Sequence, residues 1–155
     1  MGTHLKPGDP APEFAAPATD GRLLRSTDYL GRKLVLYFYP MDDTPGCTKQ
    51  ACSLRDTSAS IASRGAAIVG VSAQGSESHQ RFTEKYSLNF PLLADTDLKI
   101  AKAYGVAGSG LSGLLRSVAK VSERVTFIID ENGRISHIID DPDCPDHGEE
   151  VLALL

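Results

Sequence analysis

Cys47 is the residue whose type and position most favour chemistry in this sequence. It lies in the segment 40–48, where an apolar run gives way to a sequence typical of a helix, and it falls in the first turn of that helix. Free backbone N–H groups and the positive end of the dipole at a helix start favour the thiolate, the nucleophilic form of cysteine. Gly46 lets a small substrate approach those donors. This position predicts attack on the O–O bond of a peroxide, which would leave a sulfenic acid.

Neighbouring residues are expected to shape the pocket around this sulfur. The hydroxyl of Thr44 can point toward the sulfur or toward a polar substrate, and Tyr39 beside Pro40 can form a wall of the pocket. Asp42 and Asp43 are adjacent, so their side chains should diverge, and a paired-carboxylate mechanism is not expected.

Cys52 follows Cys47 by five positions. On an intact helix this spacing separates two residues by about 7.5 Å along the axis and about 140° around it. A disulfide does not tolerate that separation, so a bond between them requires local unwinding of the helix. On spacing alone, Cys52 is either the second thiol of a redox pair or an unreactive cysteine that faces the core.

Cys144 lies in the acidic, proline-containing segment 140–147. Its carboxylates disfavour a thiolate, so we expect an exposed thiol without a chemical role. Cys144 and His147 could join Cys47 and Cys52 around zinc, but the C-x4-C spacing is at the loose limit for ligands and the other pair is distant in sequence. No metal site is therefore predicted. The four histidines show no triad or cluster spacing and are expected to be solvated or to cap helices: His4, His79, His137 and His147.

The predicted elements follow one another as strand, helix, strand, helix, hairpin and helix. Residues 5–25 carry four prolines and should form turns and short edge strands that cap the core. The ranges that follow are a central strand 33–39, a helix 45–64, a strand 66–72, a helix 76–86, an extended piece 90–95, a short helix 97–104 with Asp97 near its start, strands 125–130 and 134–139 around Asn132-Gly133, and a closing helix 147–155. The segment 105–120 is unassigned and is a candidate mobile loop. This order implies parallel strand pairing and resembles a thioredoxin-like three-layer α/β fold with an N-terminal extension.

Length and composition limit the remaining possibilities. The 155 residues suit a single domain spanning 1–155. A formal charge of −4 favours neither nucleic acid nor an anionic membrane as a partner. The sequence has neither a long apolar run nor a secretory-signal pattern, so we expect a cytoplasmic protein, or an organelle protein whose transit peptide is absent. No cofactor is expected, because the sulfur itself carries the electrons and no phosphate-binding G-x-x-x-x-G-K-[ST] motif is present.

Several blocks of sequence, in order, resemble one protein family. The pattern Pro40-x-x-x-Thr44-x-x-Cys47 is similar to the peroxiredoxin active-site signature. The blocks 37–40, 51–56, 90–95 and 126–130 extend the likeness over about residues 5 to 140 and resemble the peroxiredoxin Q subfamily, also called bacterioferritin comigratory protein. Ordered blocks of this kind are far more specific than one short motif.

The resemblance implies a role for each matching residue. Cys47 would be the peroxidatic cysteine and Cys52 the resolving one, and Arg124 would hold the thiolate and polarise the peroxide. It also implies a thiol-dependent peroxidase with a hydroperoxide substrate and thioredoxin or a similar dithiol as reductant. Because the disulfide would lie within one chain, we expect a monomer.

Two departures from the family pattern and two rival functions stay open. Gln50 stands where the subfamily often has Glu, and the segment 108–122 does not match the expected sequence. A thiol–disulfide oxidoreductase that acts on proteins would share the fold, but it would carry C-x-x-C, and here Thr44 occupies the first position. The other rival is a thioredoxin-fold binding or metal-storage module in which the cysteines coordinate an ion, and peroxidase activity that is insensitive to a chelator would exclude it.

Overall fold

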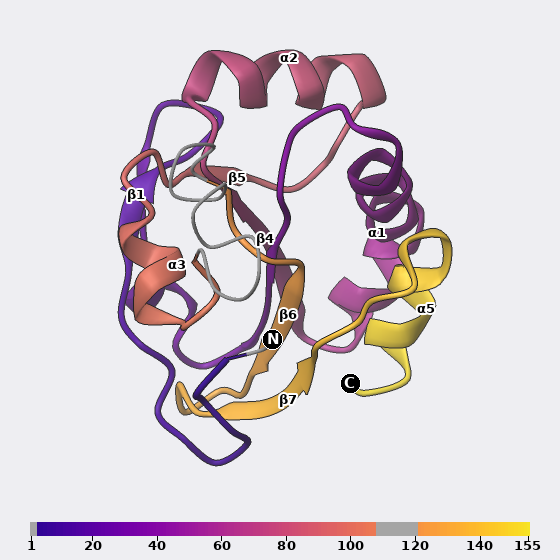
Figure 1. The fold of residues 1–155 in the computed structure, drawn as a ribbon. Helices are drawn as coiled ribbons and strands as arrows, with labels where there is room; N and C mark the ends of the chain where they lie inside the picture. The colour runs from indigo at the N-terminus through magenta and orange to yellow at the C-terminus, as the bar shows by residue number, and fades with distance from the viewer. Residues whose placement is uncertain (1–2, 108–120) are drawn as a thin grey trace.

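The computed structural model describes residues 3–107 and 121–155 (Figure 1). Most of the unassigned segment 105–120, and with it most of the stretch that departs from the family pattern, lies outside these described residues. None of the helices within the described ranges combines the length and apolar character needed to cross a membrane.

The core of the protein is a five-stranded sheet with the order β5-β4-β3-β6-β7. Its strands are β3 (Lys33–Phe38), β4 (Ala66–Ser72), β5 (Leu92–Ala94), β6 (Val125–Ile129) and β7 (Ile135–Ile139). β3 pairs in parallel with β4, and β4 pairs in parallel with β5, whereas β6 and β7 run antiparallel. The predicted central position of the first long strand and the predicted C-terminal hairpin are both confirmed.

Side chains that alternate along β3 divide the core into two halves. Val35 and Tyr37 belong to the cluster on one face, and Leu36 and Phe38 belong to the cluster on the other. This alternation is what a strand covered on both faces requires.

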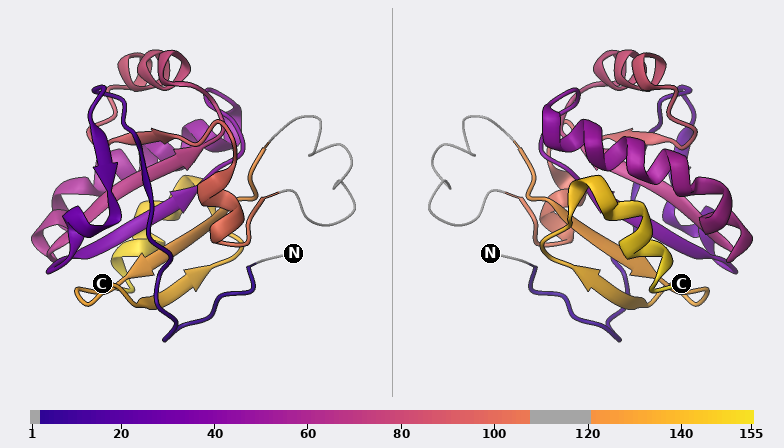
Figure 2. Two further views of the ribbon diagram at one scale, coloured as in Figure 1. Left: turned by 90° about the vertical axis from the view of Figure 1, so that its left-hand side faces the viewer. Right: turned by 90° about the vertical axis from the view of Figure 1, so that its right-hand side faces the viewer.

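Helices and a small hairpin cover the two faces of the sheet (Figures 1 and 2). The first face is covered by α1 (Pro45–Ser63), α2 (Ser76–Tyr86) and α5 (His147–Leu152), which the turn η2 (Cys144–Asp146) precedes. The second face is covered by α3 (Lys99–Ala103), by the hairpin of β1 (Ala15–Pro17) and β2 (Leu23–Arg25), and by the turn η1 (Ser26–Tyr29). The predicted thioredoxin-like three-layer fold with an N-terminal extension is confirmed.

The start of α3 differs from the prediction. We expected Asp97 near the beginning of a helix over 97–104, but the helix begins at Lys99, because Leu98 has a left-handed backbone with φ 59°. Asp97 still lies near this start, because its Oδ1 accepts from the backbone N–H of Lys99 at 3.1 Å. The carboxylate of Asp95 accepts hydrogen bonds from the next two backbone N–H groups, those of Ile100 and Ala101, at 3.0 and 2.9 Å. A carboxylate there satisfies donors that a helix start leaves free.

Candidate active site

Cys47 lies in the first turn of α1, directly after the loop that leaves the central strand. Thr44 is the residue before the helix and has extended backbone angles, and Pro45 occupies the first helical position, where its fixed φ suits the helix. The Cys47 side chain is 1% exposed and packs in the cluster that contains Tyr37 and Tyr39. The predicted position of the sulfur at a helix start is therefore confirmed.

Arg124 directly precedes β6, the strand next to β3, and reaches this helix start from there. Its Nη1 donates to Oε1 of Gln50 at 2.7 Å. Its Nη2 lies 3.2 Å from the position that a Cβ on residue 46 would take. Glycine at position 46 thus gives the guanidinium room to approach the turn that carries Cys47. The structure brings these predicted site residues together.

Thr44 has a different partner from those we expected. Its Oγ1 donates to the carbonyl oxygen of Met41 at 2.9 Å, across the loop of residues 40–44. Its only proton is therefore committed to the loop, so the oxygen can act toward the sulfur or a substrate only as an acceptor.

Asp42 anchors this loop through a buried hydrogen-bond network. Its carboxylate accepts from the hydroxyls of Tyr39 and Ser78, at 2.6 and 2.7 Å, and faces Nδ1 of His79 at 2.7 Å. The other ring nitrogen of His79 lies 2.9 Å from the carbonyl oxygen of Leu93. Both nitrogens face acceptors, an arrangement that only a ring with hydrogen on both nitrogens satisfies, and the ring pairs with the Asp42 carboxylate.

This network overturns the expectation that His79 is solvated or caps a helix. Burial acts to raise the pKa of Asp42, but the hydrogen bonds and charge of His79, helped by Tyr39 and Ser78, hold that pKa below its ordinary value. No sequence signal linked Asp42 to His79, because they are 37 positions apart and meet only through the fold. The ion pair fixes the loop of residues 40–44 to α2.

Buried polar atoms lie on the same face of the sheet as the sulfur. Burial raises the pKa values of Tyr37 and Tyr39 well above the ordinary tyrosine value, so both rings stay neutral. Among the described residues, the hydroxyl of Tyr37 and Nε2 of Gln50 have no hydrogen-bond partner. An unpartnered buried donor costs about 1–3 kcal/mol, so each of these two groups lowers the stability of the fold as it stands.

Cys52 lies further along the same helix. α1 runs without interruption from Pro45 to Ser63, and the cysteines are free thiols. Cys52 is half-buried. The structure therefore describes the reduced state, in which helical geometry separates the two sulfur-bearing residues as the spacing predicts.

Cys144 lies close to the start of α1, and the prediction that its thiol is exposed is wrong. Its Sγ is 4.0 Å from the position of a Cβ on residue 46, and the side chain is half-buried rather than exposed. In the described ranges, no three His, Cys, Asp or Glu side chains are grouped as metal ligands.

His147 follows Cys144 and is fully buried, so the prediction of a solvated or capping histidine is wrong. Nδ1 donates to Oε1 of Glu150 at 2.9 Å, and Nε2 accepts from the hydroxyl of Thr126 at 2.8 Å. This pattern describes a neutral ring. Burial lowers the pKa of His147, against the opposing effect of Glu150.

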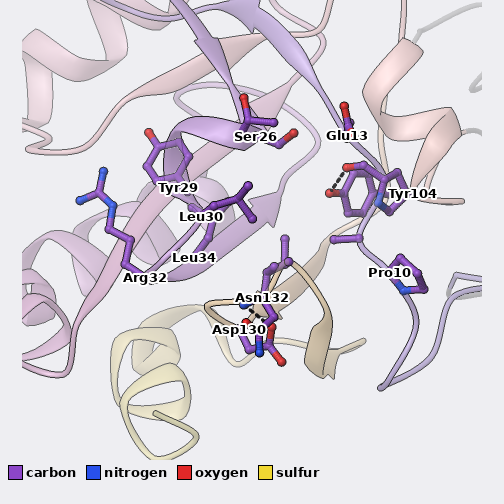
Figure 3. Close-up of a pocket in the computed structure, with 15 residues that line it drawn as sticks. Pro10, Glu13, Ser26, Tyr29, Leu30, Arg32, Leu34, Tyr104, Asp130 and Asn132 are labelled. Atoms are coloured by element: carbon purple, nitrogen blue, oxygen red, sulfur yellow. Dashed lines mark hydrogen bonds between the residues drawn. The ribbon is translucent and has the colours of Figure 1, made fainter.

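A pocket of about 230 Å³ lies at the other end of the sheet (Figure 3). Its lining includes Pro10, Tyr29, Leu34 and Tyr104. Leu34 lies near the start of β3, whereas Cys47 follows the end of that strand. Six strand residues span about 20 Å, so this pocket is separate from the thiol site.

Comparison with known proteins identifies the relatives of this chain. The pattern of the AhpC/TSA family matches residues 7–138. Peroxiredoxin Bcp of Escherichia coli K12 is 39% identical over 148 residues, which are 96% of this chain and 94% of that protein. The chloroplastic peroxiredoxin Q of Sedum lineare is 40% identical over 149 residues, which are 96% of this chain and 76% of that protein.

Solved structures agree with these relatives. Peroxidoxin BcpB of Mycobacterium tuberculosis superposes with a TM-score of 0.86 at 32% identity, covering 97% of this chain and 96% of that one. A Xanthomonas campestris bacterioferritin comigratory protein, described for its alkyl peroxide reduction activity, has a TM-score of 0.80 at 28% identity and covers 90% of this chain and 88% of its own.

A buried thiol at a helix start, close to an arginine on a thioredoxin-like sheet, defines the class of thiol-dependent peroxidases. The relatives place the chain within that class. It belongs to the AhpC/TSA family, and its relatives are peroxiredoxins of the Bcp and Q type.

Proposed function

We propose that Cys47 is the peroxidatic cysteine of this thiol peroxidase and that Cys52 is its resolving cysteine. The observation that carries the proposal is the geometry of the first turn of α1. There the buried Cys47 follows Gly46, above which the guanidinium of Arg124 lies. The helix start and the fixed positive charge both favour a thiolate and the negative charge that develops on a peroxide oxygen.

The first step is attack of the Cys47 sulfur on one oxygen of the hydroperoxide. The O–O bond breaks, and the other oxygen leaves as water or an alcohol after taking a proton. Arg124 orients the peroxide in this proposal, with Gln50 holding the guanidinium through its 2.7 Å hydrogen bond. Pro40 and Tyr39 form the neighbouring wall of the pocket, and Thr44 can accept a hydrogen bond there.

The second step is condensation of the Cys47 sulfenic acid with the Cys52 thiol. A disulfide forms and water leaves. Because α1 is continuous between the two residues, its first turns must unwind. The backbone N–H of Gly148 on α5 donates to Oγ of Ser53 at 2.8 Å, so we expect the unwound part to end before Ser53.

Hydrogen peroxide and organic hydroperoxides are the proposed substrates, and thioredoxin or a similar dithiol is the proposed reductant. The alkyl peroxide reduction described for the Xanthomonas campestris relative supports the organic substrates. An antioxidant role in redox homeostasis follows from this chemistry. We propose a monomer, because the disulfide forms within the chain and no second protomer is required. We also propose that the chain is one domain and that the protein is cytoplasmic.

The test is peroxide consumption combined with mass mapping after one equivalent of hydrogen peroxide. The wild type should form a Cys47–Cys52 bond, and Cys52→Ser should retain the first step. Cys47→Ser should consume no peroxide. An inactive Cys52→Ser with a folded chain, or an active Cys47→Ser, would contradict the assignment.

Hydrogen exchange tests the unwinding step. The oxidised wild type should lose protection over residues 46–52 and keep it over 54–63, where the same helix packs against α5. Oxidised Cys52→Ser with Cys144→Ser, in which Cys47 has no thiol partner within the chain, is the matched control and should keep the first turns protected. Equal protection over 46–52 in the reduced and oxidised wild type would refute the unwinding.

A further inference from the structure

The third thiol of the chain lies beside the proposed peroxidatic site. Cys144 belongs to η2, which packs against α1. Its Sγ lies 4.0 Å from the Cβ position of residue 46, and the guanidinium of Arg124 lies 3.2 Å from the same point. The residue next to Cys47 is therefore close to both a thiol and a cation.

Hydrogen bonds on both sides of Cys144 fix the position of its turn. The backbone N–H of Asp143 donates to Oε1 of Glu150 at 2.9 Å, and Nδ1 of His147 donates to the same oxygen. His147 in turn accepts from Thr126 on β6, the strand that directly follows Arg124. The turn that carries Cys144 is thus attached to the strand that positions the arginine.

We propose that Cys144 is a second resolving cysteine, which condenses with the sulfenic acid of Cys47 to form a Cys47–Cys144 disulfide within one chain. This inference rests on Cys47 being peroxidatic. The Cys144 sulfur attacks the sulfur of the sulfenic acid, the S–O bond breaks, and the oxygen leaves as water with the thiol proton. An external dithiol then reduces the disulfide to two thiols.

The geometry distinguishes this reaction from closure onto Cys52. Cys52 is about 140° around the helix axis from Cys47, so several hydrogen bonds of α1 must break before the two sulfurs meet. Cys144 approaches from outside the helix, at the first turn, which has the fewest intrahelical bonds to lose. In this proposal the helix start and η2 move, and α1 does not have to unwind as far as Cys52.

The charges around Cys144 set the order of events. Burial raises the pKa of the Cys144 thiol, Arg124 lowers it, and negative charge on Cys47, Asp143 and Glu150 raises it further. Conversion of the Cys47 thiolate into a neutral sulfenic acid removes one of these repulsions and leaves Arg124 in place. Cys144 therefore ionises more readily after Cys47 has reacted than before.

The experiment uses the full chain with Cys52→Ser, so that closure onto Cys52 is impossible. After one equivalent of hydrogen peroxide, this variant should lose two hydrogens in mass, and non-reducing peptide mapping should join the peptides of Cys47 and Cys144. The matched control is Cys52→Ser with Cys144→Ser. It should stop at the Cys47 sulfenic acid, trapped by a dimedone-type reagent and persisting at least about tenfold longer than in Cys52→Ser.

The outcomes separate this proposal from the function on which it rests. A Cys52→Ser variant that accumulates sulfenic acid while Cys144 stays free, or that joins Cys144 only between chains, would overturn the resolving role of Cys144 and leave the peroxidatic role of Cys47 intact. A folded double variant that forms no sulfenic acid would overturn the assignment of Cys47 and, with it, this proposal.

Discussion

Replacement of Gly46 by alanine should separate the stability of the protein from its chemistry. The new Cβ would lie 3.2 Å from Nη2 and 3.8 Å from Cζ of Arg124, so the guanidinium must give by a few tenths of an ångström. A misplacement of 1 Å at a reacting centre lowers a rate by about 100-fold, so this shift should slow reduction of peroxide by roughly three- to tenfold.

The same substitution favours the helix. Alanine is better than glycine inside a helix by about 0.5–1 kcal/mol, so the reduced protein should be stabilised by up to this amount. If Cys52 must wait for the first turns to unwind, the same free energy should slow formation of the Cys47–Cys52 bond by roughly two- to fivefold. The variant should therefore be at least as stable as the wild type and slower in both steps.

Each step has its own assay. The chain has no tryptophan, so the peroxide step is measured by competition with a second peroxidase, and the disulfide step by rapid quenching and mass spectrometry. Urea unfolding gives the free energy of unfolding. Gly75→Ala is the steric control: Gly75 is the N-cap of α2, and a Cβ there has no atom within 4 Å. A Gly46→Ala enzyme that reduces peroxide at the wild-type rate would refute the argument that the arginine must lie close to residue 46.

Three further predictions concern buried polar groups. Gln50→Glu removes an unpartnered N–H donor and gives Arg124 an ionic partner, so the free energy of unfolding in urea should rise by about 1 kcal/mol. Peroxide reduction should slow in the same variant, and a loss of stability would contradict the prediction. His79→Asn leaves the Asp42 carboxylate without its ionic partner and should lower the free energy of unfolding in urea by about 3–5 kcal/mol. Tyr39→Phe removes one hydrogen bond to Asp42 and should lower it by only about 1 kcal/mol, so equal losses would refute the ion pair. The pKa of His147 is lowered below 6.5, so on acidification the unfolded chain binds this proton before the folded chain does. The free energy of unfolding should therefore fall as the pH drops below about 6.5, by at most about 1.4 kcal/mol per pH unit, until the lowered pKa is reached. His147→Asn should show a flatter profile of unfolding free energy against pH, and an unchanged slope would contradict the assignment.

Local sequence patterns were sufficient for most of the secondary structure. The bounds of β4 and α2 agree with the predicted ranges 66–72 and 76–86, because branched apolar runs and helix-forming polar runs are read over neighbouring residues. Asp95 and Asp97 show the limit of this approach. Both precede the same helix and both accept from its first backbone N–H groups, but the left-handed backbone at Leu98, which no residue type announces, moves the first helical residue to Lys99.

The sequence alone placed the candidate peroxidatic cysteine at a helix start, because a cysteine after Pro45 and Gly46 at a strand-to-helix boundary is a local signal with a physical reason. Only the tertiary structure placed Arg124 above Gly46, joined Asp42 to His79, and brought Cys144 to the start of α1. These contacts join segments that are far apart in the chain. They depend on which strands are neighbours in the sheet and on how closely α5 packs against α1, and no local pattern encodes either property.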